Sequence, residues 1–329
     1  MGRLSHLRKI TGAMKIQLVT PAPLKLNNGN KITALRWIKI FTRLGHRVRL
    51  TRRYDGSPCD LLIALHARRS AASIRRFRQK QPQLPLIVVL TGTDVYRDIH
   101  RDGKAKESLE HATRLVLLQN MALNEIPRRL RRKTKVIYQS AAPLVRRRRR
   151  DDGVFDVCVI GHLRAEKDPL RAAMTARSLP KTSRLRITHI GQALDPVLGK
   201  RARREAARNH RYRWLGPRSH KKTREYLAQS DLLCITSTME GSSNVLSEAL
   251  ASGVPVVATK ISGLIGTLGT NFPGYFPVGN TRRLRALLLK AESNAKFYRT
   301  LEKHSERLAH RVDPATEIEA WRRLLNSLL

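Results

Sequence analysis

The sequence predicts an α/β protein built from two doubly wound domains, and three observations support this prediction. Short apolar runs rich in β-branched residues alternate with segments of helical periodicity, which is the pattern of parallel sheets covered by helices on both faces. This alternation occurs twice, with an arginine-rich segment between the two sets. The length of 329 residues exceeds that of a usual single domain and allows two hydrophobic cores.

The predicted strands divide into two sets. Before the arginine-rich segment we expect them at residues 15–20, 47–50, 61–66, 86–92, 115–119 and 135–139. After it, the same rhythm restarts at residues 156–162, 185–191, 212–216, 231–237 and 255–259. Helical periodicity separates the strands, for example over Asp168–Ser178 and Lys221–Gln229. We therefore predict a Rossmann-like domain at residues 14–142, a linker at 143–153 and a second Rossmann-like domain at 154–312, with a cleft between the domains.

The last segment, residues 313–329, has the pattern of an amphipathic helix that starts near Pro314. We expect its apolar face to pack back on the first domain. That face consists of Ile318, Trp321, Leu324, Leu325 and Leu328. At the other end of the chain, the first predicted strand begins directly after Met14, which makes Met14 a candidate for the functional start.

Composition favours a soluble, cytoplasmic protein. No apolar run approaches the roughly 20 residues that a membrane helix needs, and basic residues interrupt the N-terminal segment where a secretory signal would be apolar. The three cysteines, Cys59, Cys158 and Cys234, are far apart and form no CxxC pair, which argues against a disulfide scaffold and a zinc site. Cys158 and Cys234 lie inside apolar runs and are expected to be buried.

The charge is unusually basic. There are 65 Lys and Arg against 25 Asp and Glu, a net charge of +40, which attracts nucleic acid, anionic membranes or phosphorylated small molecules. The basic residues are spread along the chain, and only Arg146–Arg150 forms a block, which is typical of a solvated linker. Aromatic residues are scarce, so a nucleic-acid-binding module is not indicated. We expect a diffuse basic surface that makes weak, nonspecific contacts with nucleic acid or anionic membranes.

The segment after the strand at residues 231–237 has the form of an anion-binding site. A loop, Thr238–Ser243, contains Gly241, which lets the backbone approach a ligand, and a helix follows from Asn244. The free N–H groups and the positive dipole end of such a helix favour a phosphate. Glu240 in the loop and Glu248 about one turn into the helix can accept hydrogen bonds from hydroxyl groups. This arrangement suits a sugar nucleotide.

The spacing of Glu240 and Glu248, followed by the stretch ALASGVPVVAT, resembles the donor-site signature of GT-B glycosyltransferases of group 1, the GT4-like class. The resemblance implies that Glu240 contacts the sugar and takes part in catalysis, and that Glu248 binds the ribose. It implies that the diphosphate is held by the loop and helix-start residues Gly241, Ser242, Ser243, Asn244 and Val245. It also implies the two-domain GT-B fold, a UDP-sugar as donor substrate and no tightly bound cofactor.

The stretch IGHLRAEKDPL, residues 160–170, follows a predicted strand. Group 1 enzymes commonly have Gly-Arg-x-x-x-x-Lys here, and the resemblance implies that both cations grip the donor phosphates. Lys167 matches this pattern, whereas His162 replaces the arginine and Arg164 follows two residues later. His162, Arg164 or both therefore complete the clamp, in which cations stabilise the charge that develops on the leaving UDP. Residues 189–191 and 214–216 fall where the family lines its base pocket, with ordinary strand-to-turn segments as the alternative.

The first predicted domain contains a glycine-bearing loop, Asn27–Asn30, before an amphipathic helix. The resemblance implies that Gly29, with Asn30 beside it, lets the backbone approach the donor phosphate and the transferred sugar. A simple turn before a helix is the alternative. The apolar residues of the helix are Leu35, Ile38 and Phe41.

Further stretches are similar to one small bacterial subfamily, the selenosugar synthases of selenoneine biosynthesis. These are GNKITALRW, LGHRV, TGTDVYRD, IYQSAAP and GHLRAEKDP. This similarity implies transfer of a hexosyl group from UDP-N-acetylglucosamine or UDP-glucose to selenophosphate. Thr91, Thr93 and Arg97 form the expected acceptor wall, with Asp94 orienting Arg97. A capped loop at a helix start is the alternative for this segment.

Metal is not expected at the donor site, because the chain has no Asp-x-Asp pair and helix dipoles with basic residues can hold UDP instead. Two other functions stay open. One is a conventional group 1 glycosyltransferase that acts on a hydroxyl acceptor, with its basic face on anionic lipid. The other is a nucleic-acid-binding protein on a degenerate enzyme scaffold. Neither the preferred sugar nor the stereochemical course follows from the sequence.

Overall fold

The structure, a computed structural model, describes residues 12–21, 29–146 and 153–328. The chain divides into two compact units, which we call unit 1 (Met1–Leu118, Leu123–Ile137 and Glu317–Leu329) and unit 2 (Gln119–Ala122 and Tyr138–Thr316). The predicted linker at residues 143–153 falls in unit 2, and Arg147–Arg150 of the arginine block lie outside the described residues.

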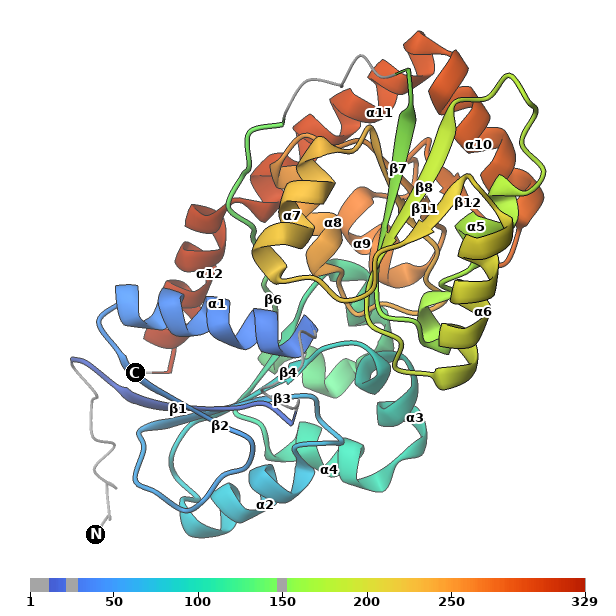
Figure 1. The fold of residues 1–329 in the computed structure, drawn as a ribbon. Helices are drawn as coiled ribbons and strands as arrows, with labels where there is room; N and C mark the ends of the chain where they lie inside the picture. Colours follow the sequence, from blue (N-terminus) through green and yellow to red (C-terminus); the bar gives the residue numbers. More distant parts are fainter. Residues whose placement is uncertain (1–11, 22–28, 147–152, 329) are drawn as a thin grey trace, which may run out of the picture. The chain divides into compact units, whose positions relative to one another are not determined.

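Unit 1 contains a six-stranded sheet in which every strand pair is parallel, in the order β2-β1-β3-β4-β5-β6 (Figure 1). Its central strands are fully buried, which explains their unbroken apolar sequences, because helices cover both faces of such a sheet. The strands are β1 (Lys15–Val19), β2 (Arg47–Thr51), β3 (Leu61–Leu65), β4 (Leu86–Leu90), β5 (Arg114–Leu117) and β6 (Thr134–Val136).

The helices of this half of the chain include one from the far end of the sequence. In α12 (Pro314–Asn326), Trp321 is fully buried, with its ring centroid 4.8 Å from that of Trp37 and 4.9 Å from that of Phe41 in α1 (Gly29–Arg43). Trp37 Nε1 donates a hydrogen bond of 2.7 Å to Glu317 Oε1, so α12 completes the core of unit 1. The helical segments are α1 (Gly29–Arg43), α2 (Ala71–Lys80), η1 (Asp94–Asp98), α3 (Ile99–Arg101), α4 (Gly103–His111), η2 (Asn120–Glu125), η3 (Arg128–Lys133) and α12 (Pro314–Asn326).

Two details of α1 differ from the sequence-based expectation. Gly29 and Asn30 are its first two residues rather than part of a preceding loop, and Asn27 and Asn28 lie outside the described residues. Leu35, expected on the buried face, is 44% exposed. The buried face instead follows Ala34, Trp37 and Phe41, spaced by three and four residues, and Leu35 points away from it.

Unit 2 contains a second six-stranded parallel sheet, in the order β12-β11-β10-β7-β8-β9. Figure 1 labels β7, β8, β11 and β12 of this sheet. The two parallel sheets confirm the α/β, doubly wound fold class. The strands are β7 (Phe155–Ile160), β8 (Leu185–Ile190), β9 (Tyr212–Trp214), β10 (Leu232–Ile235), β11 (Val256–Thr259) and β12 (Tyr275–Phe276). The two-residue β12, which the sequence analysis missed, pairs with β11 at the sheet edge.

The helices of unit 2 pack on its sheet around one continuous core. They are η4 (Ala165–Lys167), α5 (Arg171–Ala176), α6 (Pro196–Arg208), α7 (His220–Gln229), α8 (Asn244–Ala251), α9 (Ser262–Leu268), α10 (Thr281–Ser293), α11 (Ala295–Leu308) and η5 (Ala309–Val312). Cys158 and Cys234 are buried in this unit as expected, and both thiols are free. Among the residues that the structure describes, none of the helices combines the length and the apolar character that a membrane crossing demands.

Candidate functional site

The candidate site of unit 2 lies where β7 and β10, neighbours in the parallel sheet, reach their carboxyl ends. Lys167 follows β7, and Glu240 follows β10. The two side chains meet, with Lys167 Nζ 2.5 Å from Glu240 Oε1. The lysine side chain is 20% exposed and the glutamate side chain 8% exposed, so this is a largely buried ion pair. Ser237 Oγ donates a second hydrogen bond to Glu240 Oε1, at 2.7 Å.

Hydrogen bonds between loops hold this pair in place. Thr236 Oγ1 donates to the carbonyl of Lys167 at 2.8 Å, and Thr238 N donates to the carbonyl of Glu166 at 2.9 Å. Thr259, the last residue of β11, donates through Oγ1 to the carbonyl of Ser237 at 2.6 Å. Hydrogen bonds therefore connect the segments at the carboxyl ends of three adjacent strands, β7, β10 and β11. These bonds restrict the positions of the two charged groups.

The helix that follows is α8, which begins at Asn244 as predicted. Ser243 is its N-cap, and its Oγ accepts from Leu246 N at 3.4 Å. The first turn contains no acidic residue, so its positive dipole end is not neutralised by its own sequence. Ser242, Asn244 and Val245 are partly exposed here, whereas Gly241 and Ser243 are buried.

Glu248, in the second turn of α8, has a partner that the sequence analysis missed. His220, the first residue of α7, places Nε2 2.6 Å from Glu248 Oε1. The glutamate side chain is 7% exposed and the histidine side chain 43% exposed, so the ring lies over a buried carboxylate. The two residues are 28 positions apart, and only the packing of α7 beside α8 brings them together.

The three cation candidates after β7 have different environments. His162 Nδ1 accepts a hydrogen bond from Gln192 N at 3.1 Å, so the neutral ring carries its proton on Nε2 and links the loops after β7 and β8. Arg164 is exposed. Of the three, Lys167 is the one paired with the predicted site glutamate. Which of His162 and Arg164 completes a phosphate clamp stays a prediction.

The predicted base-pocket segment at residues 189–191 is built around His189, which is fully buried. Its ring lies 3.0 Å from both the hydroxyl of Tyr212 and the carbonyl of Gly161, and burial lowers its pKa to about 4. The neutral ring therefore joins β7, β8 and β9. Trp214 Nε1, from the predicted segment at 214–216, donates to the carbonyl of Gly191 at 2.9 Å.

Two glycines allow the close approach of backbone at this edge of the sheet. A Cβ on Gly191 would lie 1.9 Å from the carbonyl oxygen of Gly161, and a Cβ on Gly263 would lie 1.7 Å from the carbonyl oxygen of Glu240. No side chain fits at either distance. Gly263, which the sequence analysis did not single out, thus fixes the backbone of the loop that carries Glu240.

In unit 1, Gly29 is exposed and Asn30 partly exposed at the start of α1. The expected role of Asp94 is wrong, since it does not orient Arg97. Its Oδ1 accepts from Thr91 N and Gly92 N at 2.9 and 2.8 Å, so it caps its own loop, and Arg97 Nε instead lies 3.1 Å from Asp98 Oδ1. The alternative, a capped loop at a helix start, holds only in part, because these hydrogen bonds lie in the loop before η1, whose N-cap, Thr93, forms no side-chain capping bond. Backbone N–H groups of the loop satisfy the fully buried carboxylate of Asp94.

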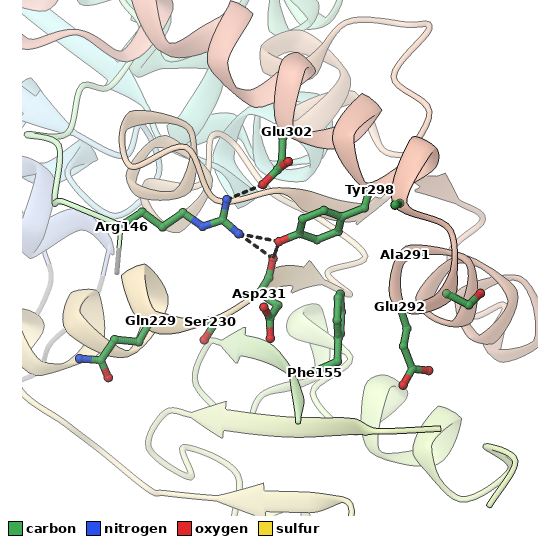
Figure 2. A pocket seen from close by; sticks show the side chains of 11 residues that line it. Arg146, Phe155, Gln229, Ser230, Asp231, Ala291, Glu292, Tyr298 and Glu302 are labelled. Carbon is green, nitrogen blue, oxygen red and sulfur yellow. Dashed lines mark hydrogen bonds and ion pairs between the residues drawn. The ribbon is translucent and has the colours of Figure 1, made fainter. Parts of the chain in front are cut away.

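A pocket of about 390 Å³ lies at the opposite edge of the unit 2 sheet, where β7 and β10 begin. Figure 2 shows Arg146 reaching Glu302 and Tyr298, with distances of 2.8 Å from Nη1 to Glu302 Oε1 and 2.5 Å from Nη2 to the hydroxyl of Tyr298. Arg146 thus anchors the chain that leads into β7. The pocket contains none of the predicted site residues, and its lining is Arg146, Phe155, Gln229, Ser230, Asp231, Ala291, Glu292, Ser293, Ala295, Tyr298 and Glu302.

Within the described ranges, no three His, Cys, Asp or Glu side chains gather as metal ligands would. The expectation that donor binding needs no metal stays a prediction.

Solved structures with the same fold are glycosyltransferases and related enzymes. HepE of Anabaena, in complex with UDP and glucose, aligns with a TM-score of 0.73 and 17% identity over 95% of this chain and 100% of that one. Sucrose-phosphate synthase of Thermosynechococcus elongatus aligns with a TM-score of 0.74 and 17% identity over 95% of this chain and 98% of that one. A glycosyltransferase of Rickettsia africae aligns with a TM-score of 0.71 and 13% identity over 97% and 99%. At these identities the likeness shows the GT-B fold.

A search of the curated proteins found no significant match. The family model described as "Glycosyl transferases group 1" matches residues 144–308, just over half of the chain. This span contains the Lys167–Glu240 and His220–Glu248 pairs and the start of α8. The chain therefore belongs to the group 1 glycosyltransferases, and it is a transferase enzyme with the GT-B fold.

Proposed function

We propose that this enzyme transfers a hexosyl group from a UDP-sugar, UDP-N-acetylglucosamine or UDP-glucose, to selenophosphate. The observation that carries the donor half is the arrangement at the carboxyl edge of the unit 2 sheet. A cation, Lys167, and the start of α8 lie together with two buried carboxylates, Glu240 and Glu248. Family membership supports glycosyl transfer, and the UDP and UDP-glucose complexes of HepE support UDP as the carrier.

Each element of the site has a role in this proposal. The amides of the loop and of the first turn of α8 would bind the diphosphate, with the helix dipole and Lys167 offsetting its charge. Glu248 would accept hydrogen bonds from ribose hydroxyls, and Glu240 from the sugar. As the bond from the anomeric carbon to UDP breaks, negative charge grows on the leaving group, so a fixed cation stabilises the transition state more than the ground state.

Selenophosphate as acceptor rests on the sequence similarity to selenosugar synthases over stretches such as TGTDVYRD and GHLRAEKDP. The selenium atom would attack the anomeric carbon, and UDP would leave with the electron pair of the broken C–O bond. Hydrolysis of the Se–P bond by water would then release phosphate and a selenosugar. A selenium nucleophile of this kind needs no deprotonation, so the proposal requires cations near the acceptor more than a general base.

The test is an assay of UDP release. The purified chain is incubated with UDP-N-acetylglucosamine or UDP-glucose, with and without selenophosphate. We expect release that depends on selenophosphate, and its loss in Glu240→Ala and Glu248→Ala. UDP release that ignores selenophosphate but responds to a sugar or lipid hydroxyl would replace the acceptor assignment with a conventional one. No turnover, with RNA binding that survives both substitutions, would refute the enzyme proposal.

A further inference from the structure

The loops after β3 and β4 of unit 1 contain a cluster of polar side chains that the proposed donor site does not use. His66 follows β3 directly, and Thr93 and Asp98 follow β4. Because β3 and β4 are parallel neighbours, these loops meet at the carboxyl edge of the sheet, where open α/β sheets bind ligands.

His66 adopts a left-handed backbone conformation, which is uncommon for residues other than glycine, with φ at +72°. Arg69 N donates to its Nδ1 at 3.4 Å, so the proton of the neutral ring is on Nε2, which lies 3.2 Å from Thr93 Oγ1. Burial is the main cause of the lowered pKa of His66, which keeps the ring neutral at pH 7. Thr93 Oγ therefore accepts this hydrogen bond and can direct its own proton to a ligand.

Asp98 is the unusual member of the cluster. Its side chain is 5% exposed, and Arg97 Nε donates to its Oδ1 at 3.1 Å. Its Oδ2 is buried without a hydrogen-bond partner, and among the described residues it is the only carboxylate oxygen in that condition. His66 Nε2 lies 4.0 Å away, too far for a hydrogen bond. A buried charged acceptor without a donor is unfavourable, which indicates a missing partner.

Cationic side chains surround this carboxylate. Arg68 Nη1 lies 3.9 Å from Asp98 Oδ1, and the side chains of Arg68 and Arg97 are 50% and 43% exposed. Being half-exposed, they can rotate outward without breaking the core. Arg68 Nε lies 2.9 Å from Asp102 Oδ2, so Arg97 is the arginine whose remaining N–H donors can bind an anion while it stays close to Asp98.

We propose that His66, Thr93, Arg97 and Asp98 form a binding site for a small tetrahedral oxyanion that carries one proton, of the phosphate class. The P–OH group of the ligand would donate to Asp98 Oδ2. Its charged oxygens would accept from Arg97 and from the hydroxyl of Thr93. A fully deprotonated anion such as sulfate has no proton to give and would face Asp98 with like charge, so the site discriminates against it. As the acceptor subsite for selenophosphate this assignment rests on the proposed function, whereas oxyanion binding itself does not.

The experiment is calorimetric titration of the full chain at pH 7 and constant ionic strength with inorganic phosphate and, separately, with sulfate. Each titration is run with and without saturating UDP, which keeps phosphate out of the donor site. We expect phosphate to bind at least about tenfold more tightly than sulfate, the effect of one unmade hydrogen bond to a buried charge. Asp98→Asn should remove this preference, because an amide can donate to sulfate.

A matched pair of variants separates the site from the basic surface. Arg97→Met should weaken phosphate binding about tenfold, and Arg101→Met, which removes the same charge from an exposed position on α3, should leave it unchanged. Equal binding of phosphate and sulfate by the native chain, or equal effects of the two arginine variants, would overturn the inference. If Asp98→Asn does not fold, the arginine pair decides. If the chain binds UDP but does not prefer phosphate to sulfate, the oxyanion site is refuted and the donor site stands. If it prefers phosphate but does not bind UDP, the donor site is refuted and the oxyanion site stands.

Discussion

Replacing Lys167 by methionine should destabilise unit 2 and weaken nucleotide binding, for two separable reasons. The substitution removes the ammonium and keeps a flexible side chain of similar length. Glu240, 8% exposed, is left with the hydrogen bond from Ser237. Removal of one partner of a fully buried ion pair costs about 3–5 kcal/mol. Since Lys167 is 20% exposed and the serine remains, we expect a loss of about 2 kcal/mol.

The double variant K167M/E240Q makes the reasoning testable. Glutamine carries no charge, so the double variant should be more stable than the sum of the two single changes predicts, by at least about 1 kcal/mol. Its affinity for UDP should stay low, because the cation is still missing. Stability thus recovers while binding does not.

Stability should be measured for unit 2 alone, since two units need not unfold together. Hydrogen exchange in increasing urea, followed on peptides that contain β10 and α8, provides this, and calorimetry gives the UDP affinity. Free energies of unfolding that add within about 0.5 kcal/mol would refute the coupling of Lys167 and Glu240. Unchanged UDP affinity in K167M would refute the role of the cation.

Three further variants test other contacts. Gly263→Ala places a methyl group 1.7 Å from the Glu240 carbonyl, so we expect displacement of that loop and at least about a tenfold loss of UDP affinity, measured by calorimetry. His220→Ala should raise the KM for the UDP-sugar about three- to tenfold with little change in kcat, because the ring holds Glu248 in place; recovery in His220→Gln supports this role, and a fall in kcat alone contradicts it. Trp321→Ala should destabilise unit 1 by about 3–5 kcal/mol, measured by denaturant unfolding, and a loss below about 1 kcal/mol would mean that α12 adds little to the core.

Strand positions and the two-sheet fold could be predicted from the sequence because they depend on local patterns. The runs LLIAL and LIVVL became β3 and β4 with every residue buried, as an apolar run between covering helices requires. The start of α8 at Asn244 is also a local feature, because a glycine-containing loop directly precedes it, and the structure adds Ser243 as its N-cap. The edge strand β12, with two residues, is too short to leave such a pattern.

The missed features are choices among possible hydrogen-bond partners, some of them close in the sequence and some far apart. The carboxylate of Asp94 accepts hydrogen bonds from amides of its own loop and, at 3.0 Å, from the amide of Ala67. Residue spacing in the sequence does not show that Asp94 takes these partners in preference to Arg97. Likewise, the sequence marks Glu248 as a site residue but contains no sign that His220 covers it.

By itself, then, the sequence determined the fold class, the family and the segment that starts α8, because periodicity, caps and short motifs act over a few residues. The tertiary structure alone decided which side chains pair at the candidate sites. Lys167 meets Glu240 across 73 positions and His220 meets Glu248 across 28. Those pairings depend on the order in which parallel strands lie side by side and on how closely glycines such as Gly263 let the backbone approach, and neither is written in any local stretch.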